Sequence, residues 1–80
     1  MAADRAWTVR LVRDLDTGIC YAMVADPDGE ITDVSWGLSD LEAARVRRGD
    51  IGGLAWTDDA AAIDGAARRN CEIVAVTALD

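Results

Sequence analysis

The sequence predicts a small α+β domain with a mixed five-stranded sheet and two short helices, in the order strand-strand-strand-helix-strand-helix-strand. Three observations predict this fold. Apolar and polar residues alternate near both ends of the chain, as in strands that bury one face. Turns rich in aspartate and glycine separate the first three apolar segments. Two capping signals, each followed by a segment rich in alanine, indicate the helices.

The first half of the chain is predicted to form three strands joined by tight turns. Alternation over residues 6–12 indicates a half-buried strand, and residues 14–18 form a turn. Residues 19–25 are apolar on both faces, which predicts a central strand. A proline-glycine turn at residues 26–29 leads into a third strand, residues 30–36, whose two carboxylates are typical of a sheet edge.

The second half is predicted to alternate helix and strand. Residues 39–42 have the spacing of a capping box, which predicts a helix from residue 40 to about residue 48 that ends at Gly49. Residues 51–56 are expected to form a short strand. Residues 57–59 cap a second helix that reaches about residue 69, and residues 71–79 alternate as a final strand. Because crossovers are right-handed, the strand after each helix is predicted to lie parallel to the first.

Composition indicates one folded domain. The length of 80 residues accommodates one domain, predicted at residues 6–80 after a flexible leader at residues 1–5. An apolar fraction of 51% indicates a globule and not a disordered acidic tail. The basic residues are all arginine and alanine is abundant, which is typical of a GC-rich genome such as that of an actinobacterium or its phage.

No apolar run is long enough to span a membrane, and no signal-peptide pattern begins the chain. We therefore predict a cytoplasmic protein without membrane contact, in which Cys20 and Cys71 stay reduced. A disulfide between these two cysteines would need facing positions on paired strands.

The absence of histidine from the sequence excludes several kinds of chemistry. Ser-His-Asp and Cys-His catalysis, imidazole metal ligands and histidine pH switches all need this residue. Two cysteines cannot close a zinc site alone. We therefore predict a protein that is not an enzyme and holds no cofactor. Because a net charge of −7 repels a polyanion, direct nucleic-acid binding is not expected. The same charge favours a basic protein partner.

The predicted order of elements resembles the ribonuclease H-like fold. Residues 13–18 (RDLDTG) and 25–30 (ADPDGE) look like the first hairpins of that superfamily. The layout of residues 7–24 followed by residues 38–44 is also similar to HicB-type antitoxins, which use a partial version of the fold. The resemblance implies an antitoxin-like binding role. Catalytic ribonuclease H-like enzymes bind magnesium through carboxylates in these regions.

The resemblance implies an alternative function as a metal-dependent nuclease. In the predicted sheet, the carboxylates after the first strand and at both helix starts gather at one pole, outside the ends of the parallel strands. Such an enzyme would bind its metal through these residues: Asp14, Asp16, Glu42, Asp58 and Asp59. The other interpretation is that these are turn and cap residues, because helix N-termini favour anions. The arginines at both helix C-termini would mark the opposite pole.

We predict a small acidic protein-interaction or regulatory module, antitoxin-like, that binds a basic protein partner. The contacts are expected from the acidic pole and from tryptophans near strand ends: Asp14, Asp16, Asp40, Asp58, Asp59, Trp7 and Trp36. A homodimer through the third-strand edge or the tryptophans is compatible with the small core. A small-molecule-binding accessory protein is a further alternative, which would need an apolar pocket.

Overall fold

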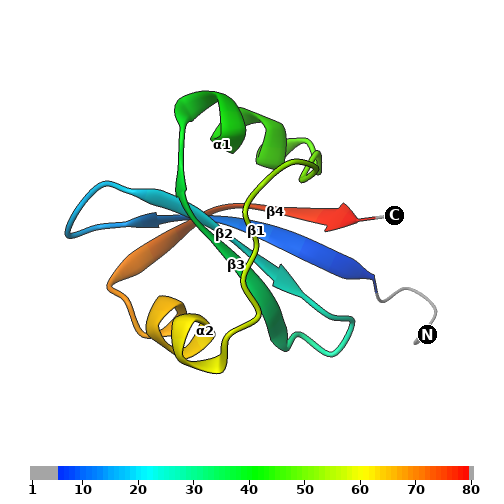
Figure 1. Ribbon diagram of the computed structural model, residues 1–80. Coiled ribbons are helices and arrows are strands. Elements are labelled where there is room, and N and C mark those ends of the chain that lie inside the picture. Colours follow the sequence, from blue (N-terminus) through cyan, green and yellow to red (C-terminus); the bar gives the residue numbers. More distant parts are fainter. Residues whose placement is uncertain (1–5, 80) are drawn as a thin grey trace.

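The computed structural model describes residues 6–79, and in this part of the chain a four-stranded sheet lies between two helices (Figure 1). The predicted leader at residues 1–5 lies outside the described residues. The sheet order is β3-β2-β1-β4, and neighbouring strands are antiparallel throughout. The elements in chain order are β1 (Trp7–Asp14), β2 (Cys20–Ala25), β3 (Ile31–Leu38), α1 (Asp40–Arg47), α2 (Ala60–Ala67) and β4 (Cys71–Leu79).

The predicted five-stranded mixed sheet is wrong. Residues 51–56 form no strand, and only Thr57 makes an isolated antiparallel bridge to Val34, with N–H···O distances of 2.9 and 3.0 Å. Gly53, at a φ of 82°, turns the backbone within the segment predicted to be extended. The predicted order and its truncated ribonuclease H-like topology are therefore wrong as well.

The direction of the last strand also differs from the prediction. β4 runs antiparallel to β1, not parallel. The right-handed crossover rule applies to one helix that links two parallel strands. Here the connection from β3 to β4 carries both helices, one on each face of the sheet, so the chain returns in the opposite direction (Figure 1).

The other predicted elements are confirmed close to their expected bounds. β2 is central and buried along nearly its whole length. The capping box of α1 is complete: the Glu42 N–H donates to Ser39 Oγ at 3.1 Å, and the Ser39 N–H donates to Glu42 Oε1 at 2.8 Å. Asp59 caps α2 by accepting the Ala62 N–H at 3.1 Å.

Alternation along the strands divides the core between the two faces of the sheet. On the α1 side, Val9, Leu11, Ala22 and Val24 of the sheet pack with Val46 of the helix. On the α2 side, Val12, Tyr21, Met23 and Val34 of the sheet pack with Ala66 of the helix. Each helix therefore closes its own half of the core.

The two helices cover the sheet unequally. α1 contacts every strand, whereas α2 packs against β3. On the α2 face the far edge of the sheet is therefore left open, and Ile73 and Val76 of β4 are 56% and 57% exposed. Within residues 6–79, neither helix has the length and apolarity needed to cross a membrane.

Candidate interaction groove

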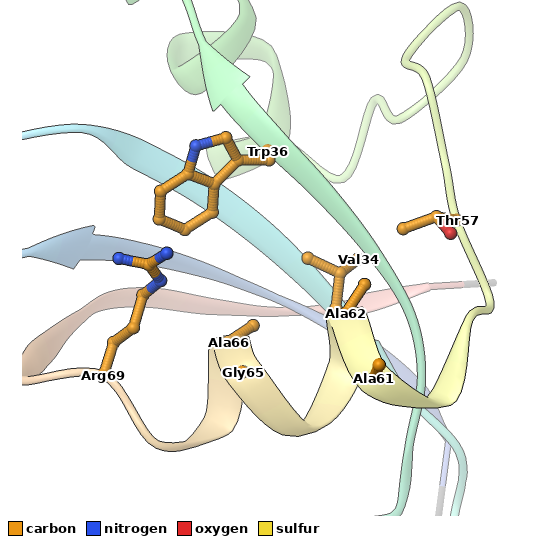
Figure 2. Close-up of a pocket in the computed structure, with 8 residues that line it drawn as sticks. All are labelled: Val34, Trp36, Thr57, Ala61, Ala62, Gly65, Ala66 and Arg69. Atoms are coloured by element: carbon orange, nitrogen blue, oxygen red, sulfur yellow. The ribbon is translucent and has the colours of Figure 1, made fainter.

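An apolar groove lies between β3 and α2 and has a volume of about 330 Å³. We call it the Trp36 groove. Figure 2 shows Trp36 and Arg69 at one end and Thr57 at the other, with the small residues of α2 between them. Its lining consists of Val34, Trp36, Thr57, Ala61, Ala62, Gly65, Ala66 and Arg69.

Small side chains on α2 keep the groove open. Ala61, Ala62 and Gly65 lie along it and fill little space. A Cβ added at Gly65 would meet no atom within 4 Å. Glycine inside a helix costs about 1 kcal/mol relative to alanine. Neither packing nor backbone conformation requires a glycine at this position, so Gly65 lowers the stability of the helix. Because Gly65 lines the groove and has no side chain, it makes the groove deeper.

Trp36 is 42% exposed, and two side chains contact its ring. Its ring centroid lies 4.5 Å from that of Tyr21, with an interplanar angle of 34°. The Arg69 guanidinium carbon lies 4.3 Å from the ring centroid, which is a cation–π contact. Trp36 thus presents apolar surface to the groove while Tyr21 and Arg69 contact its ring.

Arg69 is itself held by Asp14, the last residue of β1. Asp14 is 1% exposed and accepts a hydrogen bond from Arg69 Nη1 at 2.9 Å. It also accepts the backbone N–H groups of Asp16 at 2.8 Å and Thr17 at 3.3 Å. The Asp16 N–H contributes most to holding the pKa of Asp14 below its ordinary value, and Arg69 adds to this, while burial opposes it. Asp14 therefore ties the β1–β2 turn to the end of α2.

Tyr21 anchors the same end of the helix. Its hydroxyl donates to the Ala66 carbonyl at 3.0 Å, and both residues are buried. Ala66 lies in the last turn of α2, where helix carbonyls lack an intrahelical partner. Burial raises the pKa of Tyr21, so the phenol stays protonated and remains a donor at neutral pH.

Asp14 is expected to make the domain sensitive to acid. Its pKa in the folded state lies below the ordinary value of 3.8. The carboxylate therefore stabilises the fold fully above that value, and the contribution is lost as the pH falls through the folded-state pKa. We expect Asp14→Asn to lower stability at neutral pH and to flatten the fall in stability below about pH 4.

Urea denaturation between neutral and acidic pH measures this effect. Asp58→Asn is the matched control, because Asp58 is exposed. An Asp14→Asn variant with wild-type stability at neutral pH would contradict the structural role of Asp14.

The structure does not form the predicted acidic pole. Asp14 ends β1 and Asp16 lies in the turn that follows, both beside the C-terminal end of α2, where the Asn70 side chain donates to Asp16 at 3.4 Å. Asp58 and Asp59 lie at the other end of that helix. The predicted separation of carboxylates from arginines is wrong too, since Arg69 is bonded to Asp14. The predicted strand at residues 51–56 is the cause of this error. With that strand, α2 would run in the opposite direction, and its N-terminus would lie beside Asp14.

The candidate metal ligands are not brought together. Asp40 and Glu42 open α1 on the other face of the sheet, and the Ser39 N–H bond to Glu42 holds the pKa of that carboxyl below its ordinary value. Within residues 6–79 the structure contains no group of three or more acidic, cysteine or histidine side chains that could hold a metal ion. The alternative ligand set therefore gains no support.

The two tryptophans predicted to bind a partner lie in different places. Trp36 lines the groove on the α2 side. Trp7 pairs with Leu79 at the other end of β1 and lies two residues before the buried Val9, so it is on the α1 face of the sheet. Sequence reasoning missed Tyr21 and Arg69, which position Trp36. The signal that could have found the groove is Gly65 within a run of alanines.

The two cysteines are free thiols on opposite faces of the sheet. Cys20 packs against the α1 side and Cys71 against the α2 side. They do not occupy the facing positions that a disulfide requires.

No protein-family model matches the chain, and no curated protein or solved structure matches it significantly. The Trp36 groove and the charges around it are therefore the features that indicate a function.

Proposed function

We propose that this domain is a non-catalytic protein-interaction module that binds a basic, partly apolar segment of a partner protein in the Trp36 groove. The observation that carries the proposal is a partly exposed tryptophan at an open apolar groove, with Tyr21 and Arg69 in contact with its ring. An antitoxin that holds a basic toxin is one form of such a module. The two free thiols suit a reducing compartment, and we place the domain in the cytoplasm.

A rigid tryptophan suits protein recognition. Tryptophan, tyrosine and arginine are the residues most enriched among those that dominate binding energy. Tyr21 and Arg69 hold the Trp36 ring before any partner arrives. The ring therefore loses little conformational freedom on binding, which leaves more of the contact energy as affinity.

Charge indicates the chemistry of the partner. Asp58 and Asp59 directly follow Thr57 at one end of the groove, and both are exposed. The chain as a whole carries a net charge of −7. A lysine or arginine next to the inserted apolar side chain would reach these carboxylates. Because exposed charges are screened by salt, the affinity is expected to fall as ionic strength rises.

The groove also supports a second candidate, a small-molecule-binding accessory protein. Its volume of about 330 Å³ lies at the lower end of the ligand-pocket range of roughly 300–1,000 Å³. An uncharged apolar ligand would bind with little dependence on salt. Salt dependence therefore separates the two candidates.

Selection from a random peptide library displayed on phage tests the proposal without knowledge of the partner. The wild-type domain is the bait, and the Trp36→Ala variant is used to remove peptides that bind elsewhere. We expect the surviving peptides to share an apolar or aromatic residue flanked by lysine or arginine. Peptides without a basic residue, or an equal yield from both baits, would contradict the proposal.

Gly65 offers a test in which stability and binding change in opposite directions. We expect Gly65→Ala to raise the free energy of unfolding by about 1 kcal/mol, because the helix gains a better helix-forming residue without a clash. The added methyl group makes the groove shallower, so the affinity for the selected peptides should fall. Urea denaturation and isothermal titration calorimetry measure the two effects. Higher stability with unchanged affinity would show that the groove is not the binding site.

A further inference from the structure

The outer edge of β4 is an exposed, mostly apolar surface at the end of the sheet away from the Trp36 groove. β4 has nine residues and pairs with β1 on one side only. In the part of the chain that the structure describes, no main-chain hydrogen bond joins β4 to a segment on its outer side. The opposite edge differs, because Thr57 bridges β3 at Val34.

β4 lacks the lysine, proline and inward-pointing charged residues that often protect an edge strand from pairing, although Thr77 near its end donates a hydrogen bond to the Arg47 carbonyl at 2.9 Å. The β4 sequence CEIVAVTAL contains one charged residue, Glu72. That carboxylate is neutralised within the chain by Arg13, whose Nε donates to it at 2.8 Å. The outer edge is therefore long, apolar and uncharged apart from this ion pair.

A bulge aligns two apolar side chains along this edge. The register between β1 and β4 shifts after Leu11, so that Ile73 faces Val12 and Val76 faces Arg10. Because Val12 and Arg10 are two residues apart, Ile73 and Val76 share the α2 face of the sheet. No helix covers them there, and both are more than half exposed.

We propose that β4 pairs antiparallel with β4 of a second copy of this chain, about a two-fold axis between Val74 and Ala75. The two sheets then join into one continuous sheet. In this register Ile73 of each copy lies opposite Val76 of the other, so the same apolar contact forms twice. The pattern of the strand is thus complementary to itself, as a two-fold interface requires.

Charge does not oppose a second copy at this edge despite the net charge of −7, because the carboxylates of the two copies lie far apart. The carboxylates Asp58 and Asp59 lie by β3, and the sheet order sets β3 three strand spacings, about 14 Å, from β4. Glu72 lies opposite Thr77 of the other copy, which separates the two Glu72 residues by about 17 Å. This exceeds the screening length of about 8 Å at physiological salt. A basic strand would gain little here, because Glu72 is already paired.

The dimer does not depend on the proposed function. The Trp36 groove lies over β3, at the other edge of the sheet, and stays open when β4 pairs. Loss of dimerisation and loss of peptide binding are therefore separate results.

Sedimentation velocity from micromolar to millimolar concentration tests the dimer. We expect wild-type protein to sediment as a dimer and Val76→Lys to sediment as a monomer, because the variant loses the apolar contact with Ile73 of the other copy, which the interface makes twice. Leu41→Lys is the matched control: Leu41 is an exposed apolar residue of α1, and its replacement adds the same charge away from β4. A monomeric wild-type protein, or a dimer that Val76→Lys leaves intact, would overturn the proposal.

A charge-pair variant tests the register and shows that loss of the dimer is not simple unfolding. In Ile73→Glu/Val76→Lys, the introduced carboxylate of each copy faces the introduced ammonium of the other. We expect this double variant to dimerise again, with amide exchange at residues 73 and 76 slowed as in wild type. A double variant that stays monomeric overturns the proposed pairing.

Discussion

Replacing Tyr21 with alanine is expected to lower the free energy of unfolding by about 3–5 kcal/mol, the range for deleting a buried aromatic side chain. Tyr21 is fully buried in the central strand β2, and it contacts Trp36 and α2. Small domains are stable by only about 5–15 kcal/mol, so the loss is a large fraction of the stability of the fold. Urea denaturation followed by far-UV circular dichroism measures it.

Tyr21→Phe separates the hydroxyl from the ring. It keeps the aromatic packing but leaves the buried Ala66 carbonyl without its donor, and we expect a loss of about 1–3 kcal/mol. Amide exchange should increase mainly in α2, since the hydroxyl holds the last turn of that helix. Equal stability of Tyr21→Phe and wild type would show that the hydroxyl does not anchor α2.

Trp36→Ala is expected to weaken binding of the selected basic peptides by about 2 kcal/mol or more, the usual threshold for a dominant interface residue. This corresponds to a loss of affinity of roughly thirty-fold. The fold should survive, because Trp36 is partly exposed and lies on an edge strand. Isothermal titration calorimetry measures the affinity, and circular dichroism verifies the fold.

Trp7→Ala is the matched control for this variant. Trp7 is exposed to a similar degree but lies outside the groove. It should bind the peptides as wild type does. If the two variants lose affinity equally, the interaction surface is not the Trp36 groove.

Local signals in the sequence were sufficient for most of the secondary structure. The Ser39 capping box, the Asp59 cap and the alternation of β1 each depend on residues close together in the chain, and the structure contains all three. Residues 51–56 misled the prediction because a short apolar segment with two glycines fits a strand or a loop equally well. The residue that pairs with β3 is Thr57, which directly follows this segment and bridges Val34.

The arrangement of the site could not be predicted from local signals. The contacts of Arg69 with Asp14 and with Trp36 join residues far apart in the sequence. They depend on the direction in which α2 runs. The predicted strand at residues 51–56 would have made α2 run in the opposite direction. Trp36 was expected to bind a partner, and this stays a prediction. Asp14 was expected to do the same, but the structure buries it.

The chemical shift of the Trp36 indole N–H tests the central claim most directly. Uniformly ¹⁵N-labelled domain is titrated with a basic peptide from the selection. We expect the signals of the Trp36 indole, Ala61 and Gly65 to move together and saturate, while the Trp7 indole signal stays in place. Movement of the Trp7 signal with an unchanged Trp36 signal would contradict the account, because the peptide would then bind outside the groove.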